Sequence, residues 1–597
     1  MTPPPIAVIA VSEAGLATAR RIVEALPGAR LHGLAGRIAA ADVPFAETRS
    51  HLAALFAQGT AIVGVCAAGI LIRALAPLLA DKTAEPPVLA VSPDGAAVVP
   101  LLGGHHGANR LARALAQALG GQAAITTAGD VALGLALDEP PHGWRVANPD
   151  AAKPVAAALL AGEPVRLEVE AGQAGWLNAP GLGEDGALGV RVTDHAVMGD
   201  DELILHPPVL ALGVGCERGC DAAELSALVH ATLDEAGLSA EAVAVVASLD
   251  LKADETAVAA LAAALGVPAR FFTPAELEAE APRLATPSEV VFRETGCHGV
   301  AEGAALAAAG PQGDLIVAKS KSARATCAVA KADAIDAAAV GRARGRLFVV
   351  GIGPGAEAWR TPEVSRIIAG CTDLVGYGLY LDLLGQACHG KIRHDGTMGA
   401  EEARARQALD LAAEGRSVAL VCSGDAGIYA LATLVFELLD KEDNPAWNRV
   451  ELAVAPGISA LQAAAARAGA PINHDFCTIS LSNLLTPWPV IERRVAAAAE
   501  GDFVIAFYNP VSQRRRDQLP AARATLLRHR PPETPVVLAR NLGRDGENVR
   551  ITTLEALSAD DVDMLTLVLV GNSESRALRC GGRDWVYTPR GYASKWS

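Results

Sequence analysis

A chain of 597 residues, 51% of them apolar, is too long for one hydrophobic core and has the length of roughly three to five domains. Its formal net charge of −16 argues against nucleic acid as a ligand, because phosphate-binding surfaces usually show a basic excess. No apolar run reaches the ~18 residues of a membrane span, since Arg73, Asp81 and Lys82 interrupt the strongest one, and the first residues lack a basic leader region. We therefore expect a cytoplasmic protein without a membrane contact.

The N-terminal part predicts two α/β units. Residues 1–135 alternate strand-like runs ("PIAVIAV", "TAIVGVC", "PVLAVS", "AAVVPLL") with alanine-rich helical patterns, which predicts a parallel sheet covered by helices. Residues 136–207 are richer in Pro, Gly and Asp and predict a small connecting region of β character. A second α/β unit follows at 208–332, and residues 333–344 form a linker that suits a helix or a loop equally.

Residues 345–585 predict a third unit with two α/β halves. The runs "RLFVVGIG", "DLVGYG", "SVALVCSGD" and "ELAVAPG" are strand patterns that end in Gly or Asp, each followed by a helical pattern. The runs "DFVIAFYNP", "PVVLARNLG" and "DMLTLVLVG" predict a second sheet, with "TISLSNLL" nearby. Because α/β sheets bind ligands outside the carboxyl ends of their strands, the loops after these runs are the candidate site.

The turn "VGIGPGA" at 350–356 fits the dinucleotide pattern G-x-G-x-x-G/A, and Asp373 follows about 20 residues later. The context does not fit, because Asp373 precedes the next strand and Pro354 removes a backbone donor that a pyrophosphate would use. A nicotinamide-dependent oxidoreductase is therefore disfavoured. A tight strand-to-helix turn without a ligand remains an alternative for this motif alone.

Two further motifs are ordinary when taken singly. In "CSGDAGIYALA", Asp425 stands where a strand ends and a helix begins, so helix capping is the simpler interpretation and ligand binding the other. In "APGISALQAAAARAGAPI", Pro456 and Gly457 make a turn and Ser459 opens an alanine-rich helix.

Taken together, the motifs point to one family. The ordered set "GIGPG", "SGDAGIY", "PGISALQAAAARAGAPI", "SLSNLLTPW", "AFYNPVSQRR", "ARNLGRDGE" and "DMLTLVLVGNS" resembles the tetrapyrrole methyltransferases of cobalamin biosynthesis, and among them most closely the precorrin-3B C(17)-methyltransferases. The resemblance implies a two-lobed, class III S-adenosylmethionine-dependent fold. It also implies methylation of carbon 17 of precorrin-3B, or of cobalt-precorrin-3, with ring contraction to precorrin-4, and a homodimer formed through this unit.

The family also implies roles for single residues. Cofactor contacts are expected at Gly353, Pro354, Gly355, Ser423, Gly424, Asp425, Ala426, Gly427, Ile428, Pro456, Ala506, Asn509 and Arg540. Ring contraction needs a proton transfer, for which His474, Asp475 and Asp425 are the nearby titratable candidates. Asn483, a further candidate catalytic residue, stands where the family usually carries Asp; an amide can hydrogen-bond a substrate there but does not titrate.

Precorrins carry acetate and propionate groups, and arginine binds carboxylates in bidentate fashion. We expect Arg514, Arg515, Arg516 and Arg544 to contact an anionic tetrapyrrole, although such a run is also typical of a solvated helix start. No metal ligand set is evident in the sequence. The ten cysteines are dispersed, and the one close pair, Cys216 and Cys220, has no matching second pair.

The N-terminal half resembles a second enzyme class of the same pathway, the cobalt-precorrin-5A hydrolases, which open a lactone. The motifs are "GVCAAGILIRALAPLLADK", "LLGGHHGANRLARALA" and "ITTAGD", then "LGVGCERGC", "SLDLKADE", "TGCHGVAEGAAL" and "LIVAKSKSARATCAVA". At a helix start, His105 or His106 would act as the base, while backbone N–H groups and Arg73 hold an anion; capping and packing together with Asn109 is the alternative.

Two interpretations of the N-terminal half stay open. Either it is a second catalytic region, or it is a non-catalytic module that binds or carries a tetrapyrrole while only the C-terminal unit turns over. Within "SLDLKADE", Asp250, Lys252 and Glu255 follow a strand, and His298 precedes a helix. This part of the chain fits a binding or partner module.

Overall fold

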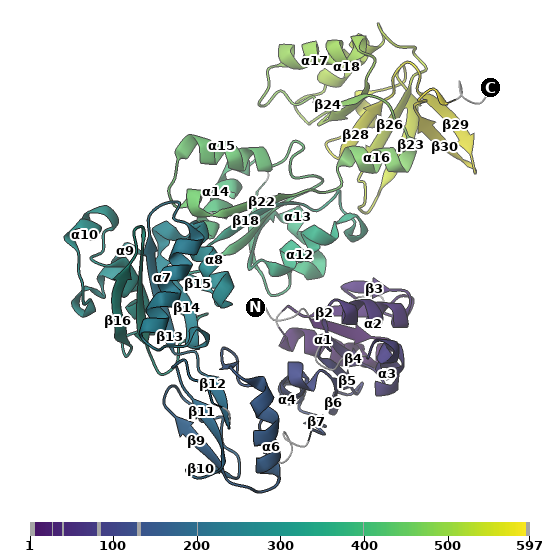
Figure 1. Ribbon diagram of the computed structural model, residues 1–597. Coiled ribbons are helices and arrows are strands. Elements are labelled where there is room, and N and C mark those ends of the chain that lie inside the picture. The colour runs from purple at the N-terminus through teal and green to yellow at the C-terminus, as the bar shows by residue number, and fades with distance from the viewer. Residues whose placement is uncertain are drawn as a thin grey trace. The chain divides into compact units, whose positions relative to one another are not determined.

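The computed structural model describes residues 6–26, 28–38, 41–79, 85–127, 133–199, 201–397 and 399–592. The chain divides into two compact units, Met1–Arg344 and Gly345–Ser597 (Figure 1). The described residues form six sheets, most of them covered by helices. The expectation of an α/β multidomain protein is therefore confirmed. Within these residues no helix is both long enough and apolar enough to cross a membrane.

The first sheet has the order β3-β2-β1-β4-β5-β6-β7. Its strands are β1 (Ile6–Ala10), β2 (Arg30–Leu34), β3 (Val43–Phe45), β4 (Ala61–Val65), β5 (Val88–Val91), β6 (Ala97–Leu102) and β7 (Gln122–Ala123). The helices α1 (Leu16–Ala25) and α4 (Ala108–Leu119) cover one face, and α2 (Thr48–Ala57) and α3 (Ala68–Leu75) cover the other.

This first sheet is mixed, which corrects the expectation of a parallel one. Strands β3, β2, β1, β4 and β5 are parallel, but β6 pairs with β5 in antiparallel register, with Val88 opposite Leu102. The short connection Ser92–Ala96 makes a hairpin, and a hairpin reverses the strand direction, whereas a parallel crossover needs a dozen or more residues. The end of β6 therefore lies at the edge of the sheet where β5 begins.

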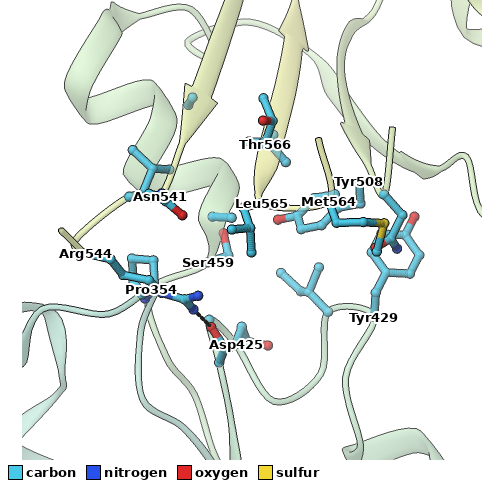
Figure 2. A pocket seen from close by; sticks show the side chains of 18 of the residues that line it. Pro354, Asp425, Tyr429, Ser459, Tyr508, Asn541, Arg544, Met564, Leu565 and Thr566 are labelled. Carbon is cyan, nitrogen blue, oxygen red and sulfur yellow. Dashed lines mark hydrogen bonds between the residues drawn. The ribbon is translucent and has the colours of Figure 1, made fainter. Parts of the chain in front are cut away.

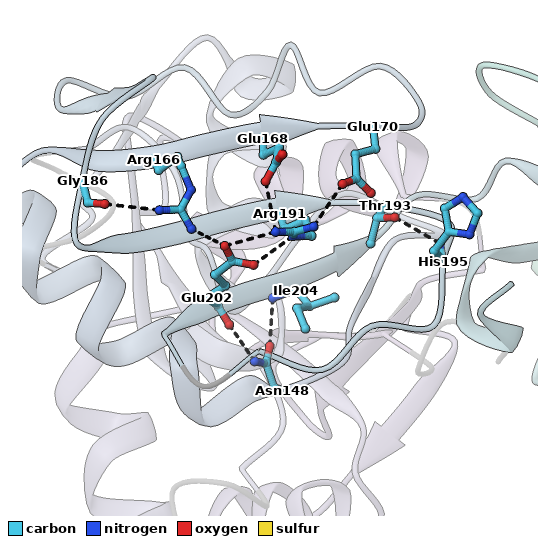
Figure 3. Close-up of polar contacts among 10 residues, drawn as sticks. All are labelled: Asn148, Arg166, Glu168, Glu170, Gly186, Arg191, Thr193, His195, Glu202 and Ile204. Atoms are coloured by element: carbon cyan, nitrogen blue, oxygen red, sulfur yellow. Dashed lines mark hydrogen bonds and ion pairs between the residues drawn. The ribbon is translucent and has the colours of Figure 1, made fainter. Parts of the chain in front are cut away.

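The middle sheet, β10-β9-β11-β12-β8, has an apolar and a charged face. Its elements are β8 (Arg145–Val146), β9 (Val165–Val169), β10 (Leu182–Gly183), β11 (Leu188–Val192), β12 (Glu202–His206) and α6 (Ala152–Leu160). On the face away from α6, Arg191 pairs with Glu168, Glu170 and Glu202, and Arg166 also pairs with Glu202 (Figure 3). Because strand side chains alternate between faces, apolar residues alternate with charged ones along β9 and with Gly189 and Arg191 along β11.

The third sheet of the N-terminal unit has the order β15-β14-β13-β17-β16. It contains β13 (Leu210–Cys216), β14 (Val243–Leu249), β15 (Ala269–Phe272), β16 (Asp314–Lys321) and β17 (Ala325–Lys331). Helices α7 (Ala222–Glu235) and α8 (Thr256–Leu265) cover one face, whereas α9 (Pro274–Glu278) and α11 (Val300–Ala309) cover the other, and α10 (Glu289–Thr295) precedes α11.

A buried ion pair joins the middle sheet to the third one. Asp194, in the turn after β11, is 1% exposed, and its Oδ2 lies 2.7 Å from Lys331 Nζ at the end of β17. Backbone bonds reinforce the junction, since Ser239 N donates to Asp194 O and Ala196 N donates to Gly237 O. Residues 333–344 form no helix; Arg342 bridges to Phe271 of β15.

The first lobe of the C-terminal unit is a fully parallel sheet, β20-β19-β21-β18-β22. Its elements are β18 (Arg346–Gly351), β19 (Asp373–Tyr377), β20 (Ile392–Gly396), β21 (Ser417–Cys422) and β22 (Glu451–Ala455), with α12 (Pro362–Gly370), α13 (Gly378–Asp382), α14 (Glu401–Ala413) and α15 (Ala432–Glu442). Strand β20, whose sequence "IRHDG" is polar, is the one that sequence patterning missed.

The second lobe has the sheet β24-β25-β28-β26-β27 and a small sheet β23-β30-β29. Its elements are α16 (Ala460–Ala468), β23 (Gly469–Ala470), β24 (Phe476–Ser480), α17 (Trp488–Glu500), β25 (Val504–Tyr508), α18 (Gln518–Leu526), β26 (Pro535–Arg540), β27 (Asn548–Thr553), β28 (Thr566–Val570), β29 (Arg576–Cys580) and β30 (Arg583–Tyr587). A capping box between Ser459 and Gln462 starts α16. The two predicted halves of this unit are confirmed.

Candidate functional site

Three loops of the first lobe meet at the carboxyl ends of adjacent strands. They follow β18, β21 and β22, and their backbones touch through glycines. Gly353 N donates to Gly424 O at 3.1 Å, and Gly424 N returns a bond to Gly353 O at 2.8 Å. A β-carbon at Gly351 would lie 2.6 Å from Gly424 O and 2.8 Å from Gly457 N. Only glycine permits this packing of backbone on backbone.

The carboxylate of Asp425 holds two of these loops together. Its Oδ1 accepts from Gly427 N at 2.8 Å, and its Oδ2 accepts from Gly457 N at 3.0 Å. Asp425 does not cap a helix, because α15 begins only at Ala432, with Leu431 at its N-cap. The simpler interpretation drawn from the sequence, helix capping, is therefore wrong, and the carboxylate connects the loop after β21 to the loop after β22.

A cleft of about 220 Å³ lies between the two lobes, at the ends of these loops (Figure 2). The first lobe contributes Pro354, Tyr380, Ser423, Gly424, Asp425, Ile428 and Tyr429. The second lobe contributes Ser459, Ala460, Tyr508, Asn509, Ala539, Asn541, Leu542, Arg544, Met564, Leu565, Thr566 and Leu567.

Arg544 crosses the cleft from the second lobe to the first. Its Nε donates to the carbonyl of Pro354 at 2.6 Å, and its Nη2 donates to the hydroxyl of Ser423 at 2.8 Å. The guanidinium lies 5.9 Å from the centre of the Tyr380 ring, and burial lowers its pKa. A half-buried cation thus closes one end of the cleft.

Tyr429 crosses at the other end in the opposite direction (Figure 2). Its hydroxyl donates to the Thr478 carbonyl of edge strand β24 at 3.1 Å, and its ring lies 5.1 Å from that of Tyr508. Tyr429 has φ 51°, a conformation that a bulky side chain rarely adopts. Asn509 and Asn541, with φ 50° and 51°, also line the cleft. Backbone strain of this kind is often found at ligand sites.

Six of the residues expected to contact a cofactor line this cleft. They are Pro354, Ser423, Gly424, Asp425, Ile428 and Asn509. The others expected there, Gly353, Gly355, Ala426, Gly427, Pro456, Ala506 and Arg540, do not line it. Ala426 and Ala506 are fully buried in the cores of their lobes. Gly353 and Gly355 pack closely against neighbouring backbone. Sequence reasoning missed Tyr429, Tyr508 and Asn541, although each stands inside or beside a motif that carried the resemblance.

The structure separates His474 and Asp475 from the cleft. Both residues precede β24, whereas the cleft lies at the ends of β24 and β25, because these strands are parallel with Phe476 opposite Val504. The five residues of β24 lie between them and the cleft, so neither His474 nor Asp475 lines it. Asn483 follows β24 and lies on the exposed loop at the cleft edge, outside the lining.

The expected arginines divide into three groups. Arg544 lines the cleft, as described above, and also binds first-lobe groups. Arg515 donates to the carbonyls of Leu481 at 2.9 Å and Asn509 at 2.7 Å, so it supports the loop backbone. Arg516 pairs with Asp560 at 2.6 Å, and Arg514 is exposed beside it. Sequence could not separate these neighbours, since their contacts depend on loop geometry.

In the N-terminal unit the antiparallel β6 divides the expected site. The loop Gly103–Gly107 follows β6, and a β-carbon at Gly103 would lie 2.6 Å from Pro86 O, at the beginning of β5. Arg73 belongs to α3, which starts at the ends of the parallel strands. The loop that carries His106 and the helix that carries Arg73 thus leave the sheet at opposite edges. The side chain of His105 lies outside the described residues, and Asn109 donates to Thr127 instead of capping α4.

Metal chemistry finds no support among the described side chains. No group of three or more His, Cys, Asp or Glu residues is placed there to hold a metal ion. His298 is bound by Glu278, whose carboxylate lies 2.9 Å from Nδ1 and raises the pKa of the imidazole. Burial raises the pKa of the Cys216 thiol to about 11, which makes it a weak nucleophile.

Three models of known families match separate stretches of the chain. Residues 346–558 match the family model of the tetrapyrrole (corrin/porphyrin) methylases. Residues 50–130 match the model of the cobalamin synthesis G N-terminal region, and residues 210–330 match that of the cobalamin synthesis G C-terminus. These matches confirm the resemblances seen in both halves of the sequence.

Individual relatives agree with the family models. Over 251 residues the chain is 45% identical to the precorrin-3B C(17)-methyltransferase of Sinorhizobium sp, covering 98% of that protein and 42% of this chain. It is 44% identical over 252 residues to the cobalamin biosynthesis protein CobIJ of Mycobacterium tuberculosis (strain ATCC 25618 / H37Rv), covering 42% of this chain and 48% of that relative, about half its length. The crystal structure of the methyltransferase CobJ is 41% identical, with a TM-score of 0.39, covering 41% of this chain and 100% of that one.

Proposed function

Because the chain belongs to the tetrapyrrole (corrin/porphyrin) methylases, we propose that its C-terminal unit methylates carbon 17 of precorrin-3B, or of its cobalt form, and contracts the ring to give precorrin-4. The observation that carries this proposal is the inter-lobe cleft formed by the loops "GIGPG", "SGDAGIY" and "APGIS". We assign S-adenosylmethionine, the methyl donor, to the same cleft.

The residues of the cleft fit such a cofactor. Gly424 lines it, and the loop after β18 packs beside it on the second lobe: a β-carbon at Gly355 would lie 2.7 Å from Gly543 O, so that position admits no larger side chain. Polar groups from both lobes face it, among them Ser423, Asn509 and Asn541. We assign the binding of the cofactor to these residues, and the positioning of the loops to Asp425.

The donor, once bound, supplies a methyl group already activated on a sulfonium. The chain then has to orient the acceptor carbon and exclude water, and good alignment of reactants contributes about 7–11 kcal/mol to such a step. Arg544 and Tyr429 hold the two lobes at the ends of the cleft and so fix its geometry. For the proton transfer that ring contraction needs, the cleft offers the hydroxyls of Tyr429 and Tyr508 in place of His474 and Asp475.

The N-terminal unit, we propose, acts on a tetrapyrrole of the same pathway. Its matches at 50–130 and 210–330 support a hydrolase that opens the lactone of cobalt-precorrin-5A. The alternative is a non-catalytic module that binds an intermediate. The strand order and directions of the first sheet favour neither alternative.

The methyl transfer is tested with the full chain, S-adenosylmethionine and either precorrin-3B or cobalt-precorrin-3. Mass spectrometry of the product should show one added methyl group and the ring-contracted skeleton. Asp425→Ala should lower the affinity for S-adenosylhomocysteine, measured by calorimetry. A well-folded wild-type chain that binds this ligand but methylates neither macrocycle would refute the proposed function.

The N-terminal activity needs a separate assay with cobalt-precorrin-5A. Loss of a two-carbon fragment supports the hydrolase, and tight binding without turnover supports the binding module. We also propose a homodimer formed through the C-terminal unit, for which α15 offers Phe436, 52% exposed. A monomer mass in light scattering at micromolar concentration would contradict it.

A further inference from the structure

Exposed apolar side chains occur both in the cleft lining and on the loop after β24. Leu484 and Leu485, in the loop after β24, are 86% and 94% exposed, the highest values among the large apolar side chains described in the C-terminal unit. Tyr429, Met564 and Leu565 are 53%, 50% and 49% exposed and also line the cleft. We call these five residues the apolar rim. Apolar area left in water costs roughly 25 cal/mol per Å², so a gathered patch of this kind indicates a binding partner.

Strand register places the apolar rim at one edge of the second-lobe sheet. Strands β24 and β25 are parallel, with Ser480 opposite Tyr508, and β28 runs antiparallel to β25. The loop that follows β24 and the loop that precedes β28 therefore leave the sheet at the same edge. Two strand spacings, about 10 Å, separate β24 from β28. The Tyr429 hydroxyl on Thr478 connects the first lobe to this edge.

The cleft is too small for both reactants of a methyl transfer to a macrocycle. Its volume is about 220 Å³, and sites that enclose a drug-sized ligand have ~300–1,000 Å³, so a methyl donor bound there fills the cleft and leaves no room in it for the macrocycle. Once the methyl donor lies in the cleft, a four-ring macrocycle has to lie at its mouth. Tyr429 and Met564, two residues of the apolar rim, lie at one end of the cleft, whereas Arg544 and Pro354 lie at the other end (Figure 2).

The charges around the apolar rim suit the same occupant. Arg514, on the loop after β25, is exposed, and its neighbour Arg515 anchors this loop to the Leu481 carbonyl, three residues before Leu484. Arg540, at the end of β26, is exposed beside Met564 and pairs with Asp563. An apolar surface bordered by arginines matches a flat macrocycle with apolar faces and carboxylates at its margin.

We propose that the apolar rim is the platform on which one face of the tetrapyrrole macrocycle lies during methyl transfer. Leu484 and Leu485 are its outer contacts, and Arg514 binds a peripheral carboxylate. This assignment rests on the proposed methyl transfer by the C-terminal unit, and it names the surface where the acceptor binds.

The test uses the full chain with Leu484→Ser and Leu485→Ser combined. Because both side chains are almost fully exposed, we expect the fold and the Kd for S-adenosylhomocysteine to stay unchanged. The KM for precorrin-3B should rise about tenfold or more, with kcat at saturation little changed. The matched control combines Ile392→Ser with Leu578→Ser, which are 53% and 42% exposed away from the cleft lining, and it should keep the wild-type KM.

An unchanged KM in the Leu484 and Leu485 variant overturns the platform. So does an unchanged KM accompanied by a smaller assembly in light scattering, which would make the apolar rim an interface between copies of the chain. If the wild-type chain transfers no methyl group, the proposed function fails. The platform is then tested by equilibrium binding of precorrin-3B in the presence of S-adenosylhomocysteine. Weaker binding by the variant then supports the platform, and equal binding refutes it.

Discussion

The guanidinium of Arg544 donates to the hydroxyl of Ser423 across the cleft, with Nη2 and Oγ 2.8 Å apart. Arg544 follows β26 of the second lobe, and Ser423 follows β21 of the first, so 121 residues separate the two partners in sequence. A second bond from the same guanidinium reaches the Pro354 carbonyl. One side chain thus connects two of the three first-lobe loops to the second lobe.

Arg544→Met should therefore weaken the binding of S-adenosylhomocysteine by about tenfold or more. A hydrogen bond to a charged group contributes about 1.5–3 kcal/mol, and methionine replaces the apolar stem of the side chain but makes neither bond. Calorimetric titration measures the change. Arg550→Met, which breaks only the exposed pair with Asp561, is the matched control and should bind as the wild type does. Equal affinities of both variants would contradict the role of Arg544.

Gly355→Ala should lower both the cofactor affinity and the thermal stability of the C-terminal unit. The added β-carbon would lie 2.7 Å from Gly543 O and 2.5 Å from Arg544 Cγ, so the backbone of the second lobe has to move. Gly370→Ala is the control, because nothing lies within 4 Å of that position and alanine favours a helix by about 0.5–1 kcal/mol over glycine. A Gly355→Ala chain with the wild-type Tm and cofactor affinity would show that the close approach of Gly355 to Gly543 O contributes to neither.

Lys331→Met should destabilise the N-terminal unit by about 3–5 kcal/mol, since it leaves the buried carboxylate of Asp194 without its cation. Combining it with Asp194→Asn should restore most of the loss. Scanning calorimetry gives the shift in Tm. Arg342→Met breaks an exposed pair with Glu276 and should change the stability by less than about 1 kcal/mol. If Lys331→Met lowers the stability of the N-terminal unit no more than this control does, the ion pair with Asp194 does not stabilise the unit.

The N-terminal unit should lose stability as the pH falls below about 6.5. Burial of His32, together with the neighbouring His51 and Arg30, lowers the pKa of its imidazole from 6.5 to about 3. A lowered folded-state pKa of a base means that its contribution is fully present above the unfolded value of 6.5 and is lost as the pH falls toward about 3. The slope from one such group is at most about 1.4 kcal/mol per pH unit.

His32→Gln tests this, because glutamine does not titrate. Between pH 6.5 and 5 the Tm of the variant should fall less steeply than that of the wild type. His230→Gln, on the exposed side of α7, should keep the wild-type slope. Parallel slopes for the wild type and His32→Gln would mean that the buried imidazole does not contribute.

The first lobe shows how much local sequence determines. Its strands β18, β19, β21 and β22 were predicted from apolar runs that end in Gly or Asp, because a buried parallel strand is apolar on both faces and its end has to turn. The polar strand β20 was missed, since at the edge of the sheet it does not need an apolar sequence. The loops around Pro354, Ser423 and Asp425 were found because their glycines and turn residues are local signals.

Tertiary structure alone decided which candidates meet. His474 and Asp475 stand close in sequence to the cleft residues of the second lobe, yet one strand of five residues carries them to the opposite edge of the sheet. The hairpin before β6 likewise brings the loop with His106 to the edge of the first sheet where β5 begins, because strand direction depends on pairing and not on composition. Long-range contacts such as Arg544 on Ser423 and Asp425 on Gly457 join segments whose distance in space no local pattern encodes.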